Sequence, residues 1–153
     1  MNYEIVNLKE KMVAGILIKT TNENYKSMID IGELWGQFLG TGSFLSIPSK
    51  VNKKTIGLYT DYEGDYTKPF NFITSCEINS SEGLPSEMVI KKIESGKYAK
   101  FIINGDVQKA VGEFWTELWN MNLDRKYSSD FEEYQNNSED LSNQEIHIYI
   151  ALN

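Results

Sequence analysis

The sequence of 153 residues contains little cysteine, histidine, arginine or proline. One cysteine, Cys76, excludes an internal disulfide, and this usage is compatible with a reducing cytosol. The single histidine, His147, has no nucleophile or further ligands at a recognisable spacing, which argues against a metal site or a catalytic dyad. No zinc, phosphate-loop or dinucleotide motif is present. We therefore expect no cofactor, and we interpret Cys76 as a buried thiol and His147 as a half-exposed strand residue.

Positive charge is scarce and is not gathered into a patch. The net charge is −7, and Arg125 is the only arginine among the basic residues. A nucleic-acid interface needs a basic face that neutralises phosphates, so direct binding to nucleic acid is not expected. A cationic small molecule is the better electrostatic partner for such a chain.

Long hydrophobic runs are also absent. The longest run, residues 12–18, suits a buried strand and is far too short to cross a bilayer. Residues 1–11 are polar and carry no signal-peptide core. We expect a cytoplasmic protein without membrane contact, as a monomer or a homodimer. The length fits one domain, residues 1–153, with enough chain to bury a core unaided.

The first half of the chain predicts a strand, a helix and a hairpin, in that order. Residues 3–19 are extended in pattern. Apolar residues from 25 to 39 follow helical spacing, and glycines at 40 and 42 end that helix. Thr21 or Asn22 is a suitable N-cap. Residues 55–59 and 70–78 read as two paired strands around a polar turn.

The second half repeats this order after a linker-like segment at residues 79–87. Residues 88–103 are extended, with Gly96 at a bend, and Asp106 is a suitable N-cap for a helix from residue 107 to 121. Residues 130–134 and 145–152 predict the second hairpin. We assign one repeat to residues 1–80 and the other to residues 86–153.

The two predicted helices share a short sequence. The segment IGELW at residues 31–35 returns as VGEFW at residues 111–115, an offset of 80 residues. A glycine inside a helix costs about 1 kcal/mol relative to alanine, so Gly32 and Gly112 are expected to pack closely on the sheet. The alternative is chance similarity between two amphipathic helices. The repeated element order favours duplication.

These elements predict an α+β fold of two pseudo-symmetric β-α-β-β repeats. The antiparallel sheet would carry both helices on one face and leave a concave groove near the pseudo-two-fold axis on the other face. Grooves of this kind are good ligand sites.

Short motifs in a fixed order run along almost the whole chain: GLYTDY at 57–62, YAKF at 98–101, Gly105, Trp115, FEEY at 131–134 and EIHIYI at 145–150. Together they resemble the GyrI-like (AraC-type) effector-binding domain. The sequence departs from that pattern at residues 150–152, where a proline is common, and at Thr74-Ser75-Cys76, where a small residue and a glycine are usual.

The resemblance implies a small-molecule-binding domain like those of multidrug-sensing transcription activators such as BmrR and Rob. It implies the stand-alone form, because nothing precedes the first strand where a DNA-binding unit would sit. Family members place one acidic residue in an aromatic groove that receives a cationic ligand. The matching position here is Glu132.

Strand alternation gives a separate argument for Glu132. If Phe131 faces the helices, Glu132 and Tyr134 face the groove, because successive side chains point to opposite faces. Aligning the hairpins by 75 residues pairs Glu132 with Gly57 and Tyr134 with Tyr59. A carboxylate beside aromatic rings is a receptor for an organic cation. The alternative is that Glu132 and its neighbour Glu133 are solvated charges on an edge strand.

Further aromatic residues are candidates for the groove. Trp35 and Trp115 lie on apolar helical faces, where tryptophan is usually core, and the alternative is that they form the groove walls. Tyr149 would reach the groove from the last strand, Trp119 would line its rim or a dimer contact, and Tyr98 would be groove or core.

Three functions follow from these features. The first is a non-catalytic protein that binds a small molecule, specifically a lipophilic cation or drug-like compound. The second is a small-molecule hydrolase of the same fold with Glu132 as general acid or base. The third is a gyrase-inhibitor-like interaction module. We favour the first, and binding rather than catalysis.

Overall fold

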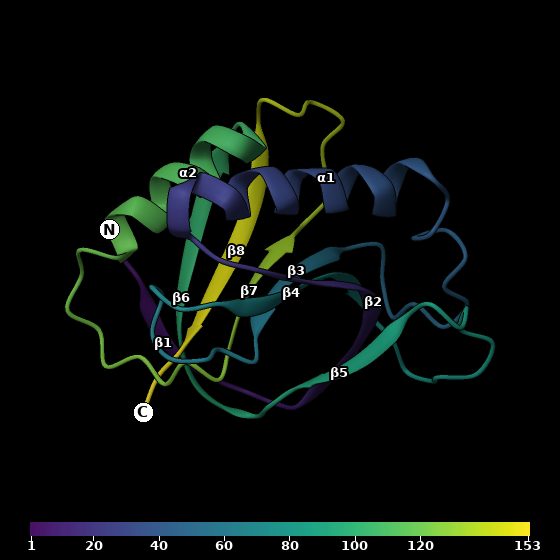
Figure 1. Cartoon of the computed structure of the whole chain (residues 1–153), viewed down its shortest axis with the longest axis horizontal. Coiled ribbons are helices and arrows are strands. Elements are labelled where there is room, and N and C mark those ends of the chain that lie inside the picture. The colour runs from purple at the N-terminus through teal and green to yellow at the C-terminus, as the bar shows by residue number, and fades with distance from the viewer.

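One antiparallel sheet of eight strands organises the chain, in the order β1-β6-β8-β7-β3-β4-β2-β5. The computed structural model describes residues 1–153. Figure 1 shows both helices above one face of a curled sheet, with β5 on the far side. The elements are β1 (Glu4–Leu8), β2 (Lys11–Thr20), a 3-10 turn (Glu23–Tyr25), α1 (Lys26–Gly40), β3 (Thr55–Thr60), β4 (Phe70–Glu77), β5 (Val89–Ile93), β6 (Gly96–Gly105), α2 (Val107–Leu118), β7 (Ser129–Tyr134) and β8 (Gln144–Ala151).

The α+β class, the antiparallel pairing and the two helices confirm the fold expected from the sequence. Each of the two long extended segments, however, is divided into two strands. The first becomes β1 and β2, and the second becomes β5 and β6. The break lets β1 pair with β6 of the other half, while β2 pairs with both β4 and β5.

The strand order reads the same from either end when the two halves are exchanged. Replacing β1, β2, β3 and β4 by β5, β6, β7 and β8, and the reverse, turns the order into its own mirror image. At the centre, β3 of the first half pairs with β7 of the second. The topology thus agrees with duplication, and the superposition of the two halves stays a prediction.

The N-termini of the two helices are capped differently. The carboxylate of Asp106 accepts a hydrogen bond from the Lys109 backbone N–H at 2.9 Å, as expected of an N-cap. By contrast, α1 begins after the 3-10 turn, with Tyr25 in the left-handed region and no side-chain cap. Instead, the Ser27 hydroxyl donates to Asn22 Oδ1 at 2.8 Å.

The expected close packing of the helix glycines on the sheet is wrong. A Cβ placed on Gly32 or on Gly112 would meet nothing within 4 Å. Both glycines therefore lie on outward surfaces of their helices, and the core contacts come from other positions. In α1 these include Leu34 and Phe38, which are buried.

Three apolar clusters occupy the two faces of the sheet, two of them on the side of the helices, where the smaller one joins Phe38 of α1 to Cys76 of β4. The larger cluster under the helices joins Leu34 of α1 and Trp115 of α2 to Tyr59 and Tyr134 of the central strands. The cluster on the opposite face contains only strand residues, Phe131 and Leu58 among them. Neither α1 nor α2 has the length and apolar character to cross a membrane.

The expected orientation of the central strand is therefore reversed. Phe131 points away from the helices and packs in the far cluster, whereas Glu132 and Tyr134 point toward α1 and α2. On the far face of these strands, Ile56, Leu58 and Phe131 are buried in one cluster, where the sequence predicted a groove.

Candidate functional site

Glu132 lies at the centre of the sheet, in β7, and is only 1% exposed. Its strand is flanked by β3 and β8, so it is not an edge strand. Glu132 is directly opposite Gly57 on β3 and Ile148 on β8. The interpretation of Glu132 and Glu133 as solvated edge charges is wrong, because Glu133 is also buried.

Three aromatic side chains donate hydrogen bonds to the Glu132 carboxylate. The Tyr59 hydroxyl and the Trp115 indole N–H both donate to Oε2, at 2.6 and 2.7 Å. The Tyr134 hydroxyl donates to Oε1 at 2.8 Å. The carboxylate is thus fixed from β3, β7 and α2 at once, and all three donors are aromatic.

Aromatic rings close the space around these hydrogen bonds. The rings of Tyr59 and Trp115 lie 4.8 Å apart between centroids, and those of Trp35 and Tyr134 lie 5.3 Å apart. Phe72 packs against Tyr59 at 4.8 Å. The first contact is tilted and the other two are edge-to-face, which are favourable geometries for aromatic pairs. We call Glu132 with Tyr59, Tyr134, Trp35 and Trp115 the aromatic cage.

Burial dominates the electrostatics of the aromatic cage. It raises the pKa of Glu132, although the hydrogen bonds from Tyr59, Trp115 and Tyr134 act in the opposite direction. Burial, followed by the charge of Glu132, also raises the pKa of Tyr59. The same two effects raise the pKa of Tyr134, so both tyrosines remain neutral donors at physiological pH. The cage holds one carboxyl group and no compensating cation.

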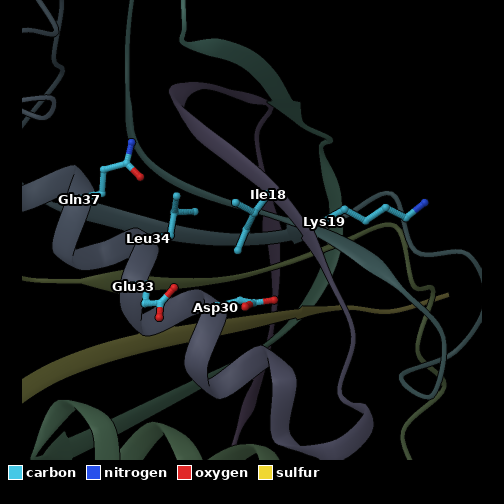
Figure 2. Close-up of a pocket in the computed structure, with 6 residues that line it drawn as sticks. All are labelled: Ile18, Lys19, Asp30, Glu33, Leu34 and Gln37. Atoms are coloured by element: carbon cyan, nitrogen blue, oxygen red, sulfur yellow. The ribbon is translucent and has the colours of Figure 1, made fainter.

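An open hollow of about 260 Å³ lies between β2 and α1. Figure 2 shows Asp30, Glu33, Leu34 and Gln37 along α1, with Ile18 and Lys19 on β2. Leu34 also belongs to the cluster that contains the cage tyrosines. Glu132 itself does not line the hollow.

The structure brings together five of the six residues expected in the site. Glu132, Tyr59, Tyr134, Trp35 and Trp115 form the aromatic cage. Tyr149 is separate, because it lies in the far cluster and stacks on Phe131 at 4.7 Å. Of the other candidates, Tyr98 is core, and Trp119 stacks on Tyr66 at 5.3 Å, away from Glu132.

A second buried polar network lies next to the cage and was missed by sequence reasoning. Asp130 is fully buried and accepts hydrogen bonds from Arg125 at 2.7 Å, from the Tyr62 hydroxyl at 2.6 Å and from the Ala151 backbone N–H at 2.9 Å. The Arg125 guanidinium also lies over the Tyr127 ring. The one feature of the sequence that could have pointed to this network is that Arg125 is the only arginine in the chain.

A family model described as "Integron-associated effector binding protein" (Cass2) matches residues 4–152. The integron cassette protein VCH_CASS2 of Vibrio cholerae is 31% identical and superposes with a TM-score of 0.76, over 99% of this chain and 95% of that one. YobU of Bacillus subtilis, named as a transcriptional regulator, is 26% identical over 97% of this chain and 96% of its own length.

A further solved structure has the same fold at lower identity. The structure of SAV2435 bound to tetraphenylphosphonium is 20% identical, with a TM-score of 0.80 over 100% of this chain and 94% of that one.

Proposed function

We propose that this chain, which belongs to the family of integron-associated effector-binding proteins, binds lipophilic organic cations at Glu132. The observation that carries this proposal is a buried carboxylate whose only side-chain partners are aromatic donors. A buried ion without a partner ion is costly, so a cation that reaches Glu132 would recover much of that cost.

The chemistry of the cage selects the kind of cation. A small hydrated ion would meet one carboxylate and no further oxygen ligands, since no cluster of His, Cys, Asp and Glu residues here is suited to a metal. A large apolar cation would instead stack on the rings of Trp35, Trp115 and the two tyrosines. Each such contact contributes about 0.5–2 kcal/mol. SAV2435, which shares the fold, is bound to a cation of this class.

Access to Glu132 requires the aromatic side chains to move. Trp35 comes from α1 and Trp115 from α2, so a shift of either helix opens the cage toward Glu132. The hollow between β2 and α1 already reaches Leu34, on the same helix as Trp35. We infer that ligands enter from the α1 side.

A charge-matched pair of probes tests the proposal. Tetraphenylphosphonium and tetraphenylborate have nearly the same shape and opposite charge. Titration followed by the fluorescence of the tryptophans is expected to detect binding of the phosphonium alone. Comparable affinity for both probes, or for neither, would overturn the proposal.

Two neighbouring substitutions provide the matched control. Glu132→Gln is expected to weaken phosphonium binding by roughly 30-fold or more, the typical cost of removing one partner of a buried charge pair. Glu133→Gln changes the same charge one residue away, on the opposite face, where Glu133 lies near Lys54. It is expected to bind like the wild type. Recovery of the phosphonium unchanged after incubation separates binding from turnover.

A further inference from the structure

Thr74 carries a buried hydroxyl with no hydrogen-bond partner. Thr74 is 0% exposed, and its Oγ1 is one of two buried side-chain polar atoms without a hydrogen-bond partner. The other is Nε of Arg125, whose guanidinium is held elsewhere by Asp130. Leaving a buried hydroxyl unpaired is unfavourable, and a methyl group of the same shape would avoid the loss. An unpaired hydroxyl at this position therefore needs an explanation.

The hydroxyl belongs to the same face of the sheet as Glu132. The residues two places before and after it, Phe72 and Cys76, pack in clusters that include side chains of α1. Since alternate residues of a strand share a face, Thr74 also faces α1. The next residue, Ser75, points to the other face, and its hydroxyl donates to the Ile56 carbonyl at 3.0 Å.

Thr74 and Glu132 lie on either side of one glycine. Gly57 is opposite Glu132 on β7 and opposite Thr74 on β4, so the three residues form one row across the sheet. Two strand spacings separate the outer residues, about 10 Å between Cα atoms. Because Gly57 has no side chain, nothing from β3 itself stands between the carboxylate and the hydroxyl.

Two aromatic rings, those of Trp35 and Phe72, cover this glycine in the closed cage. A Cβ placed on Gly57 would lie 2.9 Å from Phe72 Cζ, 3.2 Å from Trp35 Cζ2 and 3.2 Å from Glu132 Oε1. A shift of both Trp35 and Phe72 would open the space above Gly57, with the carboxylate of Glu132 at one end and the hydroxyl of Thr74 at the other.

We propose that Thr74 is a second polar contact in the ligand site, and that the ligand is an organic cation bearing a hydrogen-bonding oxygen. The cation lies against Glu132, and the oxygen of the ligand (a hydroxyl, ether or carbonyl) pairs with Thr74 across Gly57. This inference rests on the proposed function and adds a polar requirement to it. Thr74 then acts as a specificity-determining residue, which favours oxygenated cations over purely hydrocarbon ones.

Two related probes test the contact. Tetraphenylphosphonium has no hydrogen-bonding group, and 4-hydroxyphenyl(triphenyl)phosphonium adds one hydroxyl to the same cation. The wild type is expected to bind the hydroxylated probe more tightly. Thr74→Val is expected to weaken that probe by roughly 3- to 10-fold, the value of one neutral hydrogen bond, and to leave tetraphenylphosphonium within about twofold, since no hydrogen bond is lost there.

Further variants separate a ligand contact from a structural role. Thr74→Ser keeps a hydroxyl and is expected to retain the preference. Ser75→Ala removes the neighbouring, paired hydroxyl and is expected to lower the melting temperature without changing the preference. Thr74→Val is expected to raise the melting temperature of the free protein, because it removes an unpaired buried hydroxyl.

Several results would overturn the inference. The first is that the wild type binds both probes equally well. The second is that Thr74→Val weakens the binding of both probes equally. The third is that Thr74→Val lowers the melting temperature, which would reveal a hydrogen-bond partner for Thr74 inside the protein. If tetraphenylphosphonium still binds in a Glu132-dependent way, such a result removes the role of Thr74 alone. If the wild type binds neither probe, both proposals fail together.

Discussion

Replacing Glu132 by glutamine or by alanine separates two effects of this side chain in the closed cage. The carboxylate accepts three hydrogen bonds from donors that have no other partner, and it also carries a buried charge. Alanine removes both the acceptor and the charge. Glutamine removes the charge and keeps an acceptor in place.

The geometry fixes how glutamine would be accommodated. The Trp115 indole only donates, so the amide oxygen must take the Oε2 position, where it accepts from Trp115 and Tyr59. The amide nitrogen then faces the Tyr134 hydroxyl, which rotates to accept. Each of these side chains keeps at least one hydrogen bond in Glu132→Gln, although the Tyr134 O–H loses its acceptor.

The two variants should therefore differ widely in stability. In Glu132→Ala three buried donors lose their acceptor, at about 1–3 kcal/mol each, or roughly 3–9 kcal/mol before relief from the lost charge. We expect a net destabilisation of several kcal/mol. Glu132→Gln should stay within about 1 kcal/mol of the wild type at pH 7, or exceed it. Urea unfolding followed by circular dichroism measures both values.

The pH dependence supplies a second readout. Burial raises the pKa of Glu132 above its value in the unfolded chain, so the folded state binds this proton more tightly. Stability from this group is fully present below the unfolded pKa, about 4.3, and is lost as pH rises through the folded pKa. Relative to Glu132→Gln, the wild type should lose stability over that window.

The same titration should affect ligand binding in the opposite sense. A cation competes with the proton on Glu132, so phosphonium affinity is expected to rise as pH rises through that pKa. Two results would refute this reasoning about Glu132. One is Glu132→Gln being as unstable as Glu132→Ala, and the other is identical pH profiles for wild type and Glu132→Gln.

Two further predictions concern the surroundings of the cage. Gly32 and Gly36 are inside α1, with open space where a Cβ would stand. Alanine at each position should therefore stabilise the protein by up to about 1 kcal/mol, seen as a higher melting temperature. A lower melting temperature would show that α1 is not helical there. Arg125→Met leaves Asp130 charged and fully buried and should cost about 3–5 kcal/mol in urea unfolding, whereas a loss below about 1 kcal/mol would contradict the buried ion pair.

The sequence predicted the two helices and the two hairpins, because amphipathic and hairpin patterns are local signals, but it did not predict the division of each long extended segment or the pairing of β3 with β7. Glu132 is opposite Gly57, and both come from a 75-residue alignment that needs only the sequence. Tyr59 and Tyr134 follow from the same alignment by strand alternation. These residues share a face whichever way the strand is turned.

The sequence could not predict in the same way whether Glu132 and the two tyrosines point toward the helices or away from them. Every residue of β3 and of β7 is buried, so the alternation of apolar and polar residues that marks a half-exposed strand is missing. Which face meets the helices then depends on long-range packing, such as the bond from Trp115 to Glu132. The pairing of Arg125 with Asp130 depends on the path of a loop, and a loop has no periodicity from which to predict it.

The position of Glu132 explains why the two halves cannot be identical at the site. Under the 75-residue correspondence Gly57 is the counterpart of Glu132, and the register makes the same two residues direct partners across β3 and β7. Residues opposite each other in an antiparallel pair lie about 5 Å apart, so a carboxylate at both positions would bring two buried charges into contact. Two carboxylates could not both be ionised at this point in the sheet. Each half still supplies a tyrosine, Tyr59 to Oε2 and Tyr134 to Oε1. A single carboxylate held by one tyrosine from each half is therefore what the proposed duplication would produce at this point, and under the proposed function the side of Gly57 is where the ligand would lie.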